Sequence, residues 1–261
     1  MTDLSELAST FLELFDARRL VGQPVSLTAL TIEQAYAVQQ LVIDARTERG
    51  ERVVGYKVGC TSPAIRSQFG LDEPICGRVL QPHVYRHNAS VNWDRLFQPA
   101  VEPEFVIRMG QDLDRELADD EPIEQAIESV APGIEIHNYR FWFGQPTLQE
   151  LIASNGIHAS LVVGEPRVVS RGFDWNREQV SLFKNKALAA SGTGDRIMGG
   201  PLISLRWLTN HLVRRGQKLR AGDMVIPGSP VELISVLAGD TVTAQFTQLG
   251  QVTADFVSDD S

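Results

Sequence analysis

Three glutamates have the spacing expected of a metal site. Glu102 and Glu104 are separated by one residue, and Glu135 lies in a later segment of similar character. If residues 101–109 and 133–137 are β-strands, alternate side chains point to the same face, so Glu102 and Glu104 share a face and Glu135 points away from the core. If the two strands are neighbours, the three carboxylates converge on one spot.

Three carboxylates so close together repel one another, and burial would raise their pKa values unless a cation were present. A divalent ion removes this conflict. Oxygen ligands suit Mg²⁺, Mn²⁺ or Ca²⁺, and three protein ligands would leave about three octahedral positions for substrate and water. We therefore predict Mg²⁺ or Mn²⁺ as the cofactor. The alternative is that Glu102 and Glu104 lie on the solvated face of an edge strand, which Pro103 permits.

The N-terminal part of the chain is predicted to be helical. Apolar residues recur every three or four positions over residues 4–20, which predicts an amphipathic helix. A second helix is expected from Thr31, where Thr31 and Gln34 can form a capping box, to Gly50. Further helices are predicted over residues 62–70, 122–130, 147–153 and 201–214.

Short β-branched segments separated by turns predict strands in the rest of the chain. They cover residues 52–59, 75–80, 101–109, 133–137, 159–164, 180–190 and 224–226, with a final pair about residues 249–250. This mixture favours an α+β fold with a sheet that curls or closes on itself. We expect an N-terminal α/β subdomain over residues 1–80 and a β-rich catalytic domain over residues 81–261.

Composition and charge exclude several classes of protein. A chain of 261 residues with 43% hydrophobic residues can bury a substantial core without disulfides, and Cys60 and Cys76 are predicted to be buried hydrophobes. The net charge of −9 disfavours nucleic acid as a partner. No apolar run approaches the roughly 20 residues of a membrane span, and no secretory signal is recognisable, so we expect no membrane association and a cytoplasmic protein.

Several stretches together resemble the 2-keto-4-pentenoate hydratase and 4-oxalocrotonate decarboxylase family, within the fumarylacetoacetate hydrolase superfamily. They are residues 55–62 (GYKVGCTS), 72–74 (DEP) with Gly77, 102–104 (EPE), Glu135, 199–202 (GGPL) and 204–208 (SLRWL). Their order and spacing match the family over residues 54–229. The resemblance implies a mixed β-roll preceded by a smaller helical N-terminal part, usually assembled into homo-oligomers.

The resemblance also implies roles for particular residues. The metal ligands of the family fall on Glu102, Glu104 and Glu135, and its lysine near the metal falls on Lys57. We expect Lys57 to bind the substrate carboxylate or to shuttle a proton, with a pKa lowered by desolvation. The acidic residue of the following loop falls on Asp72, which could hold Lys57 or a water.

Four further residues are candidates for catalysis or substrate binding. His158 is a candidate acid/base residue, although a helix-terminal structural histidine is the alternative. Asn155 and Ser160 could hydrogen-bond the substrate, and backbone amides near Gly199 could receive a carboxylate at a helix N-terminus. His137 shares the face of Glu135 but is expected to orient or pack.

The activity implied is hydration of a 2-hydroxy-2,4-dienoate to a 4-hydroxy-2-oxo acid in the catabolism of aromatic compounds, with a small 2-oxo acid as the bound molecule. Decarboxylation of a 4-oxalocrotonate-like diacid and hydrolysis of a carbon–carbon bond in an acylpyruvate are the alternatives. Residues 154–158 (SNGIH) depart from the family pattern, because a carboxylate is absent and a histidine is added. This departure motivates a fourth reading, a non-catalytic partner of a sister enzyme.

Overall fold

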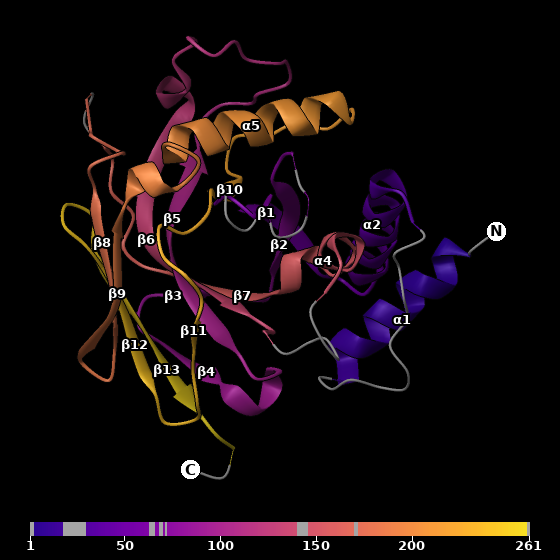
Figure 1. Cartoon of the computed structure of the whole chain (residues 1–261), viewed down its shortest axis with the longest axis horizontal. Helices are drawn as coiled ribbons and strands as arrows, with labels where there is room; N and C mark the ends of the chain where they lie inside the picture. The colour runs from indigo at the N-terminus through magenta and orange to yellow at the C-terminus, as the bar shows by residue number, and fades with distance from the viewer. Residues whose placement is uncertain are drawn as a thin grey trace.

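The computed structural model describes residues 3–17, 30–62, 66–67, 70, 72–139, 146–169 and 172–259. Helices α1 (Leu4–Ala17) and α2 (Ile32–Glu48) lie side by side at one end of the molecule (Figure 1). The predicted capping box is present at Thr31. The last residues of the predicted first helix, 18–20, lie outside the described residues, as does most of the predicted helix over residues 62–70.

The larger sheet has eight strands in the order β2-β1-β10-β5-β6-β7-β3, with β11 also paired to β5. Its strands are β1 (Arg52–Gly59), β2 (Ile75–Gln81), β3 (Val84–Arg86), β5 (Ala100–Met109), β6 (Ile127–His137), β7 (His158–Val163), β10 (Met224–Ile226) and β11 (Ile234–Ser235). The sheet curls, because β2 at one end contacts β7 and β3 at the other. One face of the sheet therefore points into the roll and the other points outward.

The smaller sheet packs against the outward face. It has the order β4-β13-β12-β8-β9, made of β4 (Ala89–Asn92), β8 (Gln179–Lys184), β9 (Ala187–Thr193), β12 (Thr241–Phe246) and β13 (Gly250–Val257). The main core lies between the sheets, where the rings of Phe105 and Phe246 meet edge to face at 5.1 Å. Helix α5 (Pro201–Arg214) crosses above and buries Leu205 and Leu208 in the same core (Figure 1).

The inside of the roll has an apolar part and a charged part. Val79, Val106, Leu161 and Ile226 pack together in the apolar part. Strands β5 and β6 place the predicted glutamates, Glu102, Glu104 and Glu135, in the charged part. A second hydrophobic cluster joins α1 and α2 to the short helix α4 (Leu148–Ala153), which leads directly to β7.

Short 3-10 helices connect several of these elements. They are η1 (Trp93–Arg95), η2 (Ile123–Ala126), η3 (Asn155–Ile157) and η4 (Gly194–Arg196). No helix in the described part of the chain is long and apolar enough to cross a membrane.

The predicted α+β class is confirmed, but two predicted elements are wrong. The helix over residues 122–130 is only the 3-10 helix η2, and the chain then enters β6, which pairs with β5 along its whole length. Pairing to a long neighbouring strand outweighs the weak local helical preference. The single strand over residues 180–190 is a hairpin of β8 and β9, which turns at Asn185 and Lys186, both with positive φ.

The division into residues 1–80 and 81–261 stays a prediction. Strands β1 and β2 come from the first of these segments, yet both belong to the larger sheet. The helices α1 and α2 pack instead with α4.

Candidate metal centre

Strands β5 and β6 place Glu102 directly opposite Glu135 in an antiparallel pair, with Glu104 opposite Gly133. Strand β5 lies between β10 and β6, so it is not an edge strand, and the alternative of a solvated face is wrong. Glu104 and Glu135 are each 1% exposed, whereas Glu102 is half-buried. The three carboxylates therefore lie inside the roll, as strand alternation predicts.

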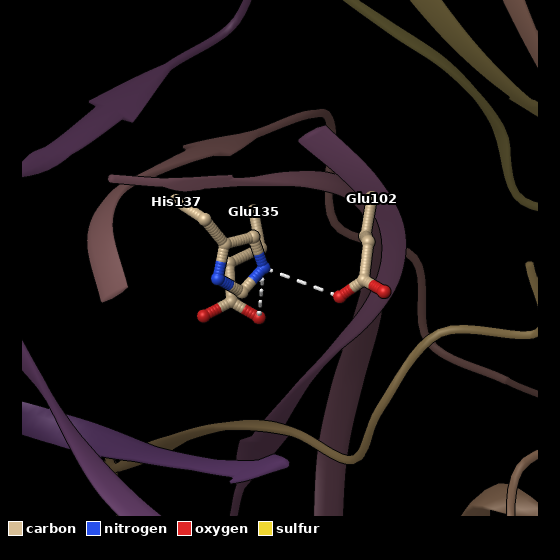
Figure 2. Close-up of side chains that lie close together, drawn as sticks. All are labelled: Glu102, Glu135 and His137. Carbon is tan, nitrogen blue, oxygen red and sulfur yellow. Dashed lines mark hydrogen bonds and ion pairs between the residues drawn. The ribbon is translucent and has the colours of Figure 1, made fainter. Parts of the chain in front are cut away.

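His137 lies between two of these carboxylates, on the same face of β6 as Glu135. Its Nε2 is 3.2 Å from Glu102 Oε2 and 3.4 Å from Glu135 Oε2 (Figure 2). One ligand atom from each of Glu102, Glu135 and His137 lies within 4.8 Å of the others. From the sequence, His137 was expected only to orient or to pack, although alternation along residues 133–137 already indicated its shared face.

The other oxygen of Glu135 is held by two basic side chains. Lys57 Nζ, from β1, is 3.1 Å from Glu135 Oε1, and His158 Nδ1, from β7, is 2.7 Å from the same oxygen. Lys57 also donates to the carbonyl oxygen of Gly156 at 3.2 Å. Burial alone would raise the pKa of Glu135, but His137, Lys57 and His158 outweigh it and hold the pKa below its usual range.

Glu104 has a different environment from its two neighbours. Its Oε2 accepts a hydrogen bond from the backbone N–H of Gly228 at 3.0 Å. Its Oε1 is buried and has no hydrogen-bond partner among the described residues. Burial raises the pKa of Glu104 well above its usual value, and the negative charges of Glu135 and Glu102 raise it further.

The two basic residues of the cluster differ in their ionisation. Burial acts to lower the pKa of Lys57, but the carboxylates of Glu135 and Glu102 prevail and raise it, so the expectation of a lowered lysine pKa is wrong. Burial lowers the pKa of His158, although Glu135 opposes this change. Lys57 is therefore an ammonium near neutral pH, and the imidazole of His158 is neutral. The Nε2 of His158 is buried and has no hydrogen-bond partner among the described residues.

The remaining predicted residues lie outside this contact network. The side-chain amide of Asn155 is occupied by the backbone of β2, since it accepts from Arg78 N at 2.6 Å and donates to Arg78 O at 2.8 Å. Ser160 pairs with Ile136, which places it on the core face of the sheet, away from Glu135.

Two predicted loop residues also take no part in the described contacts of the glutamates. Asp72 is exposed, and the described partners of Lys57 are Glu135 and Gly156. Gly199 precedes α5, where its carbonyl oxygen accepts a hydrogen bond from Asn176. The roles of Asp72, Asn155, Ser160 and Gly199 in substrate binding or catalysis stay predictions.

The donors present fit a divalent cation. The unpartnered Glu104 Oε1, the half-buried carboxylate of Glu102 and the facing carboxylate of Glu135 are oxygen donors of the kind that such an ion takes. Such hard anionic oxygens suit Mg²⁺, Mn²⁺ or Ca²⁺. A cation also relieves the repulsion that three neighbouring carboxylates create inside a protein.

Comparison with known proteins shows the family and supports the fold. Residues 71–257 match the fumarylacetoacetate (FAA) hydrolase C-terminal family, and the chain belongs to that family. It is 33% identical over 222 residues to a 2-keto-4-pentenoate hydratase of Burkholderia vietnamiensis, with 85% of each chain covered. It is 27% identical to a 2-hydroxyhexa-2,4-dienoate hydratase of Comamonas testosteroni, covering 98% of this chain and 99% of the relative.

Two solved structures extend the comparison. The 4-oxalocrotonate decarboxylase from Pseudomonas putida G7, complexed with magnesium and adipate, superposes with a TM-score of 0.89 at 26% identity and covers 98% of this chain and 99% of its own. The fumarylpyruvate hydrolase from Pseudomonas aeruginosa, in complex with Mn²⁺ and pyruvate, has a TM-score of 0.60 at 17% identity, covering 78% of this chain and 89% of its own. The second likeness concerns the fold alone.

Proposed function

We propose that this chain is a divalent-metal-dependent lyase that hydrates a 2-hydroxy-2,4-dienoate to a 4-hydroxy-2-oxo acid, in the breakdown of ring-cleaved aromatic compounds. The observation that carries the proposal is the group of Glu102, Glu104 and Glu135 inside the roll, with two basic side chains on Glu135. The relatives named as hydratases support hydration as the reaction. We retain the cytoplasm as the proposed location.

We propose Glu102, Glu104 and Glu135 as ligands for Mg²⁺ or Mn²⁺. A bound ion would act as a Lewis acid toward the carboxylate and adjacent carbonyl oxygen of a 2-oxo acid. The 4-oxalocrotonate decarboxylase from Pseudomonas putida G7, solved with magnesium and with calcium, supports a divalent ion.

Lys57 is proposed to bind the substrate carboxylate rather than to shuttle a proton. Its raised pKa keeps the ammonium charged, and a charged ammonium is a poor proton acceptor. Its contact with Glu135 Oε1 fixes the charge beside the proposed ligands. A substrate carboxylate entering this negative cluster would then meet a positive charge held in place by β1.

His158 is proposed to move the proton. Its Nδ1–H can donate to Glu135 Oε1 at 2.7 Å, which leaves the lone pair on Nε2. Hydration requires a base that takes a proton from water and an acid that delivers one to carbon. A neutral imidazole with a free Nε2 can accept the proton of water, and Glu135 stabilises the imidazolium that results. The imidazolium can then deliver that proton to carbon, which completes the addition of water and restores the neutral ring.

Decarboxylation of a 2-oxo diacid is the second candidate. The likeness to 4-oxalocrotonate decarboxylase, which extends over nearly the whole of both chains, supports it. Carbon–carbon hydrolysis of an acylpyruvate is a third candidate. A non-catalytic role beside a sister enzyme is the fourth candidate, and in that case Glu102→Gln would leave the activity of the partner unchanged. Homo-oligomeric assembly, which the resemblance implies, is also proposed.

A substrate panel tests these candidates. Purified chain with Mn²⁺ is given 2-hydroxypenta-2,4-dienoate, 4-oxalocrotonate and an acylpyruvate in turn, and product is identified by mass spectrometry. We expect the hydrated 4-hydroxy-2-oxo acid from the first substrate, and loss of at least a hundredfold in turnover for Glu102→Gln. Glu128→Gln, an exposed glutamate of β6, is the matched control and should retain turnover. Carbon dioxide from the second substrate, with no hydration of the first, would replace the hydratase proposal by the decarboxylase.

A further inference from the structure

His137 has contacts that a hydrogen bond does not explain well. Its Nε2 faces a carboxylate oxygen of Glu102 at 3.2 Å and one of Glu135 at 3.4 Å. A ring nitrogen has one N–H, which can point at only one of them. Both separations also exceed the about 2.7–2.9 Å of a hydrogen bond between charged groups.

The same separations suit three atoms around one ion. An octahedral ion with bonds of about 2.1 Å holds neighbouring ligand atoms about 3.0 Å apart. The two nitrogen–oxygen separations are close to that value, and the three ligand atoms all lie within 4.8 Å of one another. Figure 2 shows one ring nitrogen of His137 facing a carboxylate oxygen of Glu102 and one of Glu135.

We infer that His137 Nε2 is a ligand of the divalent ion, together with Glu102 and Glu135, and that this nitrogen makes the site prefer Mn²⁺ over Mg²⁺. Imidazole nitrogen binds first-row transition ions, whereas Mg²⁺ takes oxygen ligands almost exclusively. His137 is 3% exposed and fixed by β6, so its ring is already positioned for binding. The inference rests on the proposed metal site and is independent of the reaction.

His158 is the other histidine of the cluster, and its geometry makes it the weaker candidate. Its Nδ1 is engaged with Glu135 Oε1, the oxygen that Lys57 also contacts. In the described residues, the group of donors within 4.8 Å of one another contains Glu102, Glu135 and His137, and it contains neither His158 nor Glu104. Glu104 differs from His158 because its Oε1 is a buried carboxylate oxygen without a hydrogen-bond partner among the described residues. The two histidines can be distinguished by experiment because each can be replaced separately.

Pulsed electron paramagnetic resonance of Mn²⁺ bound to the chelator-stripped chain tests the ligand directly. Nitrogen bound to Mn²⁺ modulates the electron spin echo. We expect the modulation of one directly bound imidazole in the wild type, its loss in His137→Gln, and its retention in His158→Gln. His87→Gln, at an exposed histidine of the surface, is the matched control and should also retain it.

Competition between Mn²⁺ and Mg²⁺ tests the preference. We expect the ratio of their affinities to fall at least tenfold in His137→Gln and to stay unchanged in His87→Gln. If His137→Gln does not fold, retention of the modulation in His158→Gln decides the main point. The inference would be overturned if bound Mn²⁺ gave no nitrogen modulation, or if the modulation disappeared only in His158→Gln. It would also be overturned if the affinity ratio did not change in His137→Gln, or if the chain failed to bind Mn²⁺. Nitrogen modulation in a chain that turns over no dienoate would contradict the proposed reaction and would leave the inference about His137 intact.

Discussion

At the scale of single residues, Glu135 organises the site. Its two oxygens lie within 3.4 Å of Lys57, His137 and His158, which come from three strands of the same sheet. A buried carboxylate is stable only when its charge is compensated, so each of these contacts stabilises the fold in addition to any role that it has in the proposed chemistry. Changing one of them exposes both roles at once.

Lys57→Met should destabilise the metal-free chain by about 3 kcal/mol, because Glu135 would lose a buried cationic partner. Urea unfolding in the presence of chelator measures this loss. Lys218→Met is the matched control, since Lys218 pairs with Asp112 at the surface and exposed pairs contribute about 1 kcal/mol or less. Equal losses in the two variants would contradict the view that Lys57 compensates a buried charge.

Strand alternation predicted the shared face of the three glutamates, and neighbouring strands were the only further assumption. It did not predict the place of Ser160. The face that a strand residue occupies depends on register, and the partner of Ser160 is the core residue Ile136. That pairing, with a shift before His137, cannot be read from one strand alone. The same alternation placed His137 on the face of Glu135, but nothing else in the sequence indicated that His137 is a ligand.

At the scale of elements, Asn155 joins the segment before β7 to β2. Asn155→Ala removes two buried hydrogen bonds to Arg78 and should cost about 2–3 kcal/mol in urea unfolding. Turnover should fall as well, because the neighbouring carbonyl of Gly156 holds Lys57.

Asn210→Ala is the matched control for this change, since the Asn210 amide binds the backbone of Leu117 in the same two-bond manner. It should lose stability and keep turnover. A rise in KM for Asn155→Ala without loss of stability would show instead that Asn155 contacts substrate, as the sequence predicted.

The junction of α5 with α2 should respond to pH through His211. Burial, reinforced by Arg215, lowers the pKa of His211 from 6.5 to about 4, while the rings of Tyr36 and Trp207 pack against it. Because the pKa of His211 is lower in the folded chain than in the unfolded chain, the folded state is favoured while the imidazole is neutral. This contribution to stability is fully present above pH 6.5 and is lost as the pH falls toward 4.

His211→Gln should therefore lose less stability than the wild type between pH 6.5 and 4, with a difference of up to about 3 kcal/mol. Urea unfolding at several pH values measures the difference. His87→Gln serves as the control and should follow the wild type. Parallel pH profiles for His211→Gln and the wild type would remove His211 as the cause.

Element prediction succeeded where local signals are strong. The capping box at Thr31, the helix ending near Gly216 and the alternation of β5 are all local, and all are present. The helix expected over residues 122–130 failed because β6 gains its stability from pairing with β5, a contact that is distant in sequence. The curl of the sheet likewise depends on contacts of β2 with β7 and β3.

At the scale of the whole molecule, the roll places three carboxylates in its charged part, beside the apolar part formed by Val79, Val106, Leu161 and Ile226. Repulsion among the carboxylates should make the metal-free chain less stable, and a bound ion should reverse this effect. At a hundredfold excess over the dissociation constant, a ligand of the folded state contributes about 2.7 kcal/mol. For a chain of this size, that corresponds to a rise in Tm of about 5–10 °C.

Thermal unfolding with Mn²⁺ and with chelator measures this rise. Glu104→Gln should abolish most of it, whereas Glu128→Gln should leave it intact. An equal rise in both variants would mean that the ion binds elsewhere on the chain.

The most direct test of a metal-dependent hydratase is turnover of 2-hydroxypenta-2,4-dienoate as Mn²⁺ is added back to chelator-stripped chain, followed as loss of dienol absorbance. We expect negligible turnover without metal, a rise that saturates at one ion per chain, and no rise in Glu135→Gln. Turnover that is independent of metal, or no turnover with one ion demonstrably bound to the wild type, would contradict it.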